Sequence, residues 1–239
     1  MKNHFSSLRQ PAASRAFGLL TLATVSLTCA TCLSIEFVLF ERGGSKVNIS
    51  GEIVVEANDG SMLLRDRKGT LWTVQSDEIK KRSKDHTPFK LMGEDELSAA
   101  LLEEMPAGFK TYTTAHYLIC YNTSPAYAQW CGGLFERLYK AFTNFWKRRG
   151  LEMEPPSTPL VALVFADRES YKQYAEQEIG EAADSIVGYY NLATNRIVMY
   201  DLTGVQATAN RRQRGRNSAE INKVLSQPDA GKLVATVIH

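Results

Sequence analysis

An unbroken apolar segment in the second half of the chain constrains the fold more than any other feature. Residues 160–165 read Leu-Val-Ala-Leu-Val-Phe, without a polar residue on either face. Such a segment is typical of a strand that is buried on both faces. A helical pattern over residues 124–149 precedes it, and Asp167 is placed to cap a helix that follows it. The sequence therefore predicts an α+β fold.

Composition sets broad limits on what the protein does. The chain has 239 residues, of which 44% are hydrophobic, enough to form the core of one large or two small domains. The formal net charge is only +2. A chain this close to neutral has no strong overall attraction to nucleic acid or to an anionic membrane, although local clusters of charge can still matter, and we expect no nucleic-acid partner.

The N-terminus is typical of an exported or membrane-anchored protein. Lys2, Arg9 and Arg15 precede an uncharged run from Ala16 to Ile35. A run of about 20 residues is long enough to span a membrane as a helix, whereas the small residues near its end would suit signal cleavage. We therefore assign residues 1–41 to a signal or anchor segment. In either case the rest of the chain faces outward, in the cell envelope or in a secreted or periplasmic form.

Two cysteines of the expected folded part leave two interpretations open. Cys120 and Cys131 would pair as a disulfide in an oxidising compartment, or remain as two buried free thiols. Sequence alone does not give the separation of their Cα atoms, so it does not decide between the two.

A small β module is predicted over residues 46–80. Apolar and polar residues alternate there in short bursts, separated by Asn58-Asp59-Gly60 and by Lys68-Gly69. These turn-forming residues supply the positive φ that a tight hairpin needs, so the segment is predicted to be a β-meander. Residues 81–108 follow as a polar linker with a short helix over Glu94 to Met105.

A larger unit is predicted over residues 109–239. It begins with a strand over Tyr117 to Tyr121, after which Ser124 and Pro125 open a long helix that runs to Arg149. A hairpin is predicted between Ile186 and Asp201. Leu134, Leu138, Phe142 and Phe145 form the apolar stripe expected on the buried face of the long helix.

Several arginines and histidines outside the predicted helices and strands are either functional groups or ordinary solvent-facing residues. Four arginines in the loop over residues 206–216 would bind an anion or simply be solvated. His86 and His116 have no ligand-like partner nearby in sequence, and we expect both to be structural or to face solvent.

The final segment is predicted to be a buried helix. Leu233, Val234, Val237 and Ile238 lie at helical spacing, and His239 follows without a glycine or asparagine terminator. We therefore expect this helix to continue beyond the sequence given.

The order of these elements resembles the front part of a known enzyme class. The residues that carry the resemblance are the strand 160–165, the hairpin strands Gly188-Tyr189-Tyr190 and 196–200, and the segment 233–239. They resemble a family of bacterial domains of unknown function grouped with gluzincin, or peptidase-MA-like, zinc metallopeptidases. The resemblance covers roughly Thr111 to His239, and it implies a zincin-like N-terminal subdomain that is incomplete at its C-terminus.

The resemblance also implies a site. His239 would be the first zinc ligand of a His-Glu-x-x-His motif, whose catalytic Glu and second His would lie beyond residue 239. Tyr200 and Asp201 would lie on an edge strand that binds a peptide or protein substrate. Zinc would then be the cofactor of the complete protein only, because one ligand does not hold a catalytic zinc, and residues 1–239 alone would be inactive.

Two other interpretations stay open. In one, the small β module over residues 46–80 is the functional part, which binds a ligand or partner while the rest of the chain supports it. In the other, His239 would be an ordinary helical histidine, and the protein a non-catalytic envelope protein that uses the same scaffold for binding or assembly. The residues that follow His239 separate this second interpretation from the enzyme.

Overall fold

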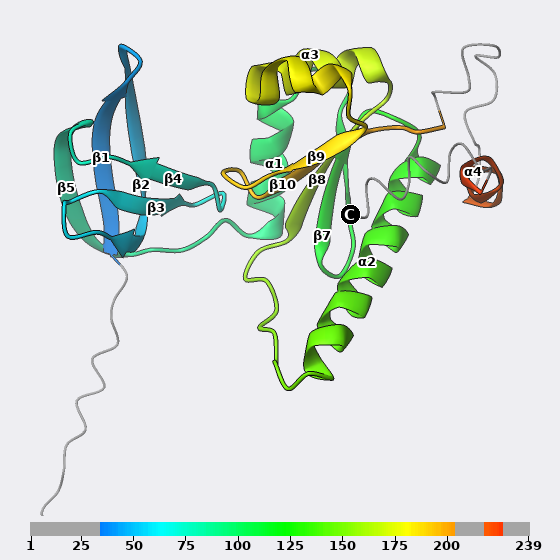
Figure 1. Ribbon diagram of the computed structural model, residues 1–239, viewed down its shortest axis with the longest axis horizontal. Helices are drawn as coiled ribbons and strands as arrows, with labels where there is room; N and C mark the ends of the chain where they lie inside the picture. Colours follow the sequence, from blue (N-terminus) through cyan, green and yellow to red (C-terminus); the bar gives the residue numbers. More distant parts are fainter. Residues whose placement is uncertain (1–33, 204–217, 227–239) are drawn as a thin grey trace, which may run out of the picture. The chain divides into compact units, whose positions relative to one another are not determined.

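The structure is a computed structural model that describes residues 34–203 and 218–226. Within these residues it is an α+β fold with two five-stranded sheets and four α-helices (Figure 1). The predicted N-terminal apolar helix lies outside the described residues. Among the helices that are described, none is both long and apolar enough to cross a membrane.

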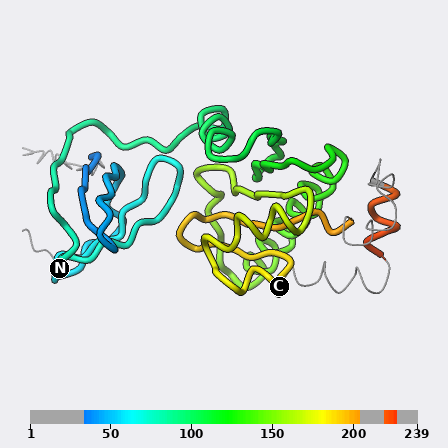
Figure 2. Tube along the Cα trace, turned by 90° about the horizontal axis from the view of Figure 1, so that it is seen from above, coloured from blue at the N-terminus to red at the C-terminus, as the bar shows by residue number. Residues whose placement is uncertain are grey.

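The first sheet is antiparallel and contains the predicted β module. Its strands follow the order β4-β3-β2-β1-β5 and curl around a core of their own (Figure 2). Val38, Phe40 and Leu64 are almost fully buried in that core. The strands are β1 (Ser34–Arg42), β2 (Ser45–Glu56), β3 (Met62–Asp66), β4 (Leu71–Val74) and β5 (Ile79–Pro88).

This sheet extends further along the chain than the sequence pattern predicts. Residues 34–41, assigned to the signal or anchor segment, form most of β1, whose alternate residues Val38 and Phe40 point into the core. Residues 81–88, assigned to the linker, belong to β5. Because β5 is an edge strand that is exposed along most of its length, its side chains are polar on both faces and lack the alternation that marks a strand.

Ion pairs take the place of apolar contacts along β5. Arg82 donates from Nε to Glu36 at 3.0 Å and from Nη1 to Glu56 at 2.7 Å. Glu36 is buried, so its pairing with Arg82 offsets part of the cost of removing a carboxylate from water. Arg82 is therefore used for ion pairing within the first sheet.

The second sheet is mixed and has the order β6-β7-β8-β10-β9. Strands β7, β8 and β10 are parallel to one another, whereas β6 and β9 are antiparallel to their neighbours and form the two edges. The prediction of a doubly buried strand is confirmed, because Val161 to Phe165 are all buried in β8. The strands are β6 (Lys110–Thr113), β7 (Tyr117–Tyr121), β8 (Leu160–Phe165), β9 (Gly188–Asn191) and β10 (Arg196–Tyr200).

Four helices accompany this sheet, and two of them begin at the caps that the sequence predicts. Ser124 accepts a hydrogen bond from the Tyr127 amide at 3.2 Å, and Asp167 accepts one from the Ser170 amide at 2.9 Å. The helices are α1 (Glu94–Glu104), α2 (Pro125–Lys147), α3 (Arg168–Ile179) and α4 (Ser218–Leu225), with a short 3₁₀ turn, η1, over Gly180–Asp184.

Only the first half of α2 packs against the core, and of the predicted stripe only Leu138 is among the residues that do so. Cys131 and Phe135 are buried among the core residues of the domain, and Leu138 packs partly against that core. Phe142 and Phe145, predicted to continue the buried stripe, are 53% and 46% exposed. The helix is longer than the sheet it packs against, so its C-terminal half runs past the strands (Figure 1).

Candidate functional site

The candidate site lies where the three parallel strands end. Asn122 and Thr123 follow β7, Asp167 follows β8, and Asp201 follows β10. The carboxyl ends of parallel strands meet at one edge of a sheet, which is where open α/β sheets bind their ligands. Asn122 joins two of these ends, because its Oδ1 accepts a 2.6 Å hydrogen bond from the Ala166 amide.

Asp201 is the most enclosed charged group at this edge. Its residue is 1% exposed, and Thr123 Oγ1 donates to its Oδ2. Thr203 donates to Oδ1 twice, from its amide at 2.9 Å and from Oγ1 at 2.6 Å. These hydrogen bonds hold the chain in a fixed direction where it leaves β10.

Tyr200 is also buried, so neither of the two predicted substrate-binding side chains faces solvent. Its ring lies 5.2 Å from the ring of Tyr171, and the residue is 4% exposed. Burial raises the pKa of Tyr200 above its ordinary value. In the described structure Tyr200 and Asp201 therefore support the sheet from within.

The prediction that β10 is the edge strand is wrong. β10 pairs with β8 on one side and with β9 on the other, so the first strand of the hairpin lies at the edge. The sequence misled here because a hairpin pattern does not say which of its strands joins the parallel core. Any extended peptide that adds to this edge would pair with β9, the strand Gly188–Asn191.

A single exposed carboxylate on α3, that of Glu178, accepts hydrogen bonds from β9 at the surface of the domain. Glu178 Oε2 accepts hydrogen bonds from Tyr189 Oη at 2.5 Å and from Asn191 Nδ2 at 2.8 Å. Its Oε1 accepts a third bond from Tyr174 Oη at 3.1 Å. Burial raises the pKa of Tyr189, and its hydrogen bond to Glu178 raises it further. The edge strand is thus held by its pairing with β10 and also by side-chain hydrogen bonds to α3.

Apolar side chains are exposed along the same hairpin. Tyr190, on β9, is 52% exposed, and Leu192, in the turn that follows, is 77% exposed. Gly188 packs so closely against β10 that an added Cβ would lie 2.8 Å from the Val198 carbonyl oxygen. The edge therefore combines a closely packed backbone with exposed apolar groups.

The zinc prediction falls on a residue that the structure does not describe. His239 lies outside the described residues, as does the segment before it. Across residues 34–203 and 218–226, no three His, Cys, Asp or Glu side chains are grouped to hold a metal ion. The geometry of the zinc site is therefore not tested by the described part of the chain.

The structure reveals a His–Glu pair that the sequence analysis missed. His116 Nδ1 lies 2.8 Å from Glu136 Oε2, while the Glu136 Oε1 accepts bonds from the His116 amide at 2.8 Å and from Thr114 Oγ1 at 2.7 Å. The imidazole stacks on Tyr139 with 3.9 Å between ring centroids. A carboxylate beside Nδ1 favours the tautomer protonated there and leaves Nε2 as an acceptor.

This pair joins the β6–β7 turn to α2. Burial raises the pKa of Glu136, but hydrogen bonds from Thr114 and His116 outweigh it, so the pKa lies below its ordinary value. His116 and Glu136 are twenty positions apart, on a turn and a helix, and no spacing rule links them. The prediction that His116 is structural or faces solvent is thus consistent with its place at the surface, although it has a specific partner.

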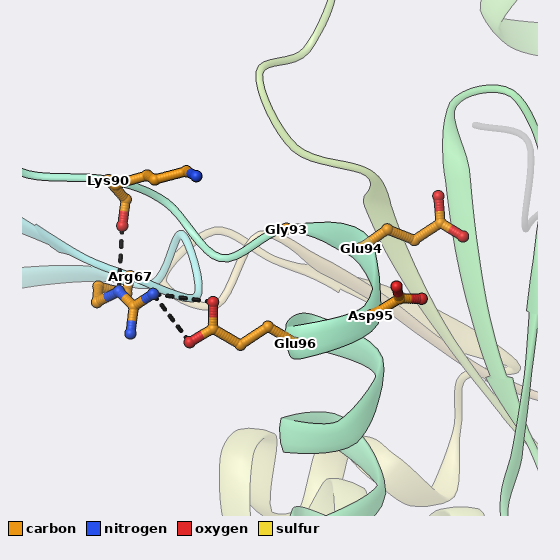
Figure 3. A pocket seen from close by; sticks show the side chains of 6 residues that line it. All are labelled: Arg67, Lys90, Gly93, Glu94, Asp95 and Glu96. Atoms are coloured by element: carbon orange, nitrogen blue, oxygen red, sulfur yellow. Dashed lines mark hydrogen bonds and ion pairs between the residues drawn. The ribbon is translucent and has the colours of Figure 1, made fainter.

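Two surface hollows of the described structure are large enough to hold a ligand. One, of about 330 Å³, is lined by His116, Glu136 and neighbouring residues of α2. The other, of about 490 Å³, lies beside the first turn of α1, where Arg67 donates to the Lys90 carbonyl oxygen and pairs with Glu96 (Figure 3). Both hollows are wide open to solvent. The carboxylates beside the second hollow belong to the first turn of α1, where the helix dipole favours negative charge, so helix stability accounts for them without a ligand.

Both cysteines of the folded part are free and buried. Of the two open interpretations, the structure has the pair of thiols and not the disulfide. Burial raises the pKa of Cys120 to about 12 and raises that of Cys131 well above its ordinary value. Neither thiol is suited to act as a nucleophile at neutral pH, because the reactive form is the thiolate.

Comparison with known proteins leaves the chain without a relative to argue from. No family model, no curated protein and no solved structure matches it. The function therefore has to be argued from its own residues.

Proposed function

We propose that the chain is the N-terminal part of an exported or membrane-anchored zinc metallopeptidase of the gluzincin type. In the complete protein, residues 109–239 would form the zincin-like subdomain that binds an extended peptide and contributes the first zinc ligand, His239. Residues 1–239 alone would not hydrolyse peptides, because a catalytic zinc needs three protein ligands.

The observation that carries the proposal is the antiparallel edge strand β9. Its inner side pairs with β10, and no described strand pairs with its outer side. An extended peptide adds to such an edge through main-chain hydrogen bonds, whatever its sequence. Glu178 accepts hydrogen bonds from Tyr189 and Asn191 and so fixes β9. A peptide that binds there would not have to order the strand, which would lower the entropy cost of binding.

The side chains beside this edge suit an apolar substrate residue. Tyr190 and Leu192 are exposed and would contact alternate side chains of a peptide on β9. The Asp201 carboxylate would not contact the substrate, since its bonds to Thr123 and Thr203 keep it inside the domain. Its part would be to fix the chain where it leaves the sheet toward the segment that contains His239.

The chemistry would come from His239 together with ligands that follow it. Zinc, when bound, would act as a Lewis acid that lowers the pKa of a water molecule toward ~7. His239 would hold its neutral imidazole toward the metal, and a Glu next to it would accept the proton of the water. The two remaining protein ligands would come from residues outside the sequence given.

The experiment that tests the proposal starts from the gene. The codons after His239 should encode Glu-x-x-His, and the complete protein should bind zinc and cleave peptides. His239→Ala should then abolish zinc binding and cleavage, while His86→Ala, which removes an exposed histidine of β5, should leave both unchanged. Another continuation after His239, or full zinc content in His239→Ala, would overturn the proposal.

The second candidate is a non-catalytic envelope protein that binds a partner through the same edge. It is favoured by the way Tyr200 and Asp201 are enclosed at the carboxyl end of β10, where many enzymes expose reactive groups. The same variants separate the two candidates. A complete protein that binds an extended peptide equally with and without zinc and in His239→Ala, and that cleaves no peptide, would support the second.

A further inference from the structure

The C-terminal half of α2 carries an exposed aromatic cluster. Phe142 and Phe145 are about half exposed, and the Trp146 ring contacts both, with centroids 6.2 Å and 5.3 Å away. Residues at these spacings share one side of a helix. The apolar stripe that packs the first half of α2 thus continues onto a part of the helix that lies beyond the sheet (Figure 1).

Positive charge surrounds this cluster. Between residues 137 and 151 there are five cations and no carboxylate. None of the five forms an ion pair with another described residue, in contrast to the cations of the first sheet. The Arg149 guanidinium instead lies 3.4 Å from the centroid of the Phe145 ring. The five exposed cations are Arg137, Lys140, Lys147, Arg148 and Arg149.

Helix stability explains only part of this arrangement. Cations in the last turn interact favourably with the helix dipole, which accounts for Lys147 and Arg148. Arg137 and Lys140 lie too far from the helix end for that effect. Nor does it explain two exposed phenylalanines at positions where polar residues would serve a solvated helix better.

We propose that this basic aromatic face, residues 137–151, binds the surface of a membrane that contains anionic phospholipid. Aromatic rings with one wet and one apolar side are enriched at the level of the lipid headgroups. Lysine and arginine around them are attracted to anionic lipids, and a basic amphipathic helix is typical of membrane-surface segments. Charge complementarity therefore selects an anionic membrane.

The position of the face suits this partner. α2 runs past strands β7 and β8 of the second sheet, so its C-terminal end is not covered by them (Figure 1). Two further exposed apolar residues, Leu151 and Met153, follow the helix and extend the apolar area. Carboxylates lie only at the two ends of this face, with Glu136 just before Arg137 and Glu152 and Glu154 after the five cations.

The fluorescence of Trp146 provides a local test in the full chain. With vesicles of equal parts phosphatidylglycerol and phosphatidylcholine whose acyl chains are brominated, Trp146 should be quenched. Trp146→Phe should abolish this quenching, whereas Trp72→Phe, which changes a partly buried ring of the first sheet, should retain it. This readout is specific to α2, so binding through the N-terminal segment alone does not produce it.

Charge variants test the anionic preference. Lys147→Gln, Arg148→Gln and Arg149→Gln together should weaken the Trp146 contact about a hundredfold at low ionic strength. The matched triple variant Lys46→Gln, Lys90→Gln and Lys110→Gln removes the same charge from exposed positions elsewhere and should have little effect. Circular dichroism of both triple variants confirms that each is folded.

Three outcomes would overturn the proposal. The first is quenching that is equal in Trp146→Phe and in the unchanged protein. The second is equally strong Trp146 quenching by vesicles of phosphatidylcholine alone. The third is a self-association that Phe142→Ser and Phe145→Ser abolish while Trp146 is not quenched by either vesicle, which would identify the occupant as a second copy of the chain.

Discussion

The Arg196 guanidinium donates a hydrogen bond of 2.7 Å from Nη1 to Oε2 of Glu104, and so ties β10 to the last turn of α1. The Arg196 side chain is only 6% exposed, and that of Glu104 is 29% exposed. A charge this deeply buried is tolerated because its partner is close and hydrogen-bonded.

Loss of the Glu104 charge should destabilise the domain. In Glu104→Gln the buried Arg196 cation has no anionic partner, and we expect the free energy of unfolding to fall by about 2 to 3 kcal/mol. Glu96→Gln on the same helix removes an exposed pair with Arg67 and should change it by less than about 1 kcal/mol. Urea denaturation of both variants measures the difference, and equal effects would contradict this assignment.

The same pair should make stability depend on acid pH. Burial raises the pKa of Glu104, but hydrogen bonds from Arg196 and Lys68 lower it more, so the folded pKa lies below the ordinary 4.5. A lowered pKa contributes stability that is complete above pH 4.5 and is lost as the pH falls through the folded value. The stability gap between the unchanged protein and Glu104→Gln should therefore narrow below that pH. A constant gap would argue against the pair as its cause.

A glycine in β2 should be indispensable to the first sheet. A Cβ on Gly51 would lie 2.1 Å from the Arg65 carbonyl oxygen and would force β2 away from β3. We expect Gly51→Ala to destabilise the β module by about 3 kcal/mol. The near-ultraviolet circular dichroism of Trp72 reports the unfolding of this module during thermal denaturation. Gly93→Ala, where a Cβ has nothing within 4 Å, is the matched control. Unchanged melting of Gly51→Ala would show that the strands separate freely.

The elements of the second sheet that the sequence predicts correctly share one property. Their patterns are local and complete: β7 and β8 are uninterrupted apolar segments, and α1 and α2 have clear beginnings and ends. The structure places β7 at Tyr117–Tyr121 and begins α2 after the Ser124 cap, as predicted. An element whose whole pattern lies in one stretch of chain is thus predictable from that stretch alone.

The features that were missed depend on partners distant in sequence. β5 is a strand because it pairs with β1, and its Arg82 forms ion pairs with Glu36 and Glu56 on other strands, so its own sequence lacks the apolar alternation. The edge position of β9 follows from β10 pairing with β8, which a hairpin pattern does not contain. Phe142 is exposed because α2 extends beyond the strands of the second sheet. The apolar stripe of a helix does not contain the length of the sheet that it packs against.

The His116–Glu136 contact should control the opening of the β6–β7 turn. Glu136 accepts bonds from the His116 amide, from its ring and from Thr114, so Glu136→Ala removes all three acceptor contacts. We expect the His116 amide to exchange its hydrogen about tenfold faster in this variant, measured by NMR hydrogen exchange. Amides of β8 serve as the internal control and should be unaffected. Equal acceleration throughout the domain would indicate global destabilisation.

The two buried thiols should be unreactive in the folded protein. The pKa of Cys120 is raised to about 12 by burial, and Cys131 is fully buried, so little thiolate forms at neutral pH. N-ethylmaleimide should label both residues only after denaturation, as shown by mass spectrometry of their peptides. A native peptide pair linked through Cys120 and Cys131 would contradict this, and so would rapid labelling of either.

The two halves of α2 should respond differently to loss of aromatic rings. Phe135 is 2% exposed and packs on Tyr117, so Phe135→Ala should lower the free energy of unfolding by about 3 to 5 kcal/mol. Phe142→Ala and Phe145→Ala remove rings that are about half exposed, and each should change it by less than about 1 kcal/mol. Denaturant titrations of the three single variants provide the comparison. If the two exposed rings prove as costly to remove as Phe135, they stabilise the fold itself, and a separate role in contacting a membrane would lose its support.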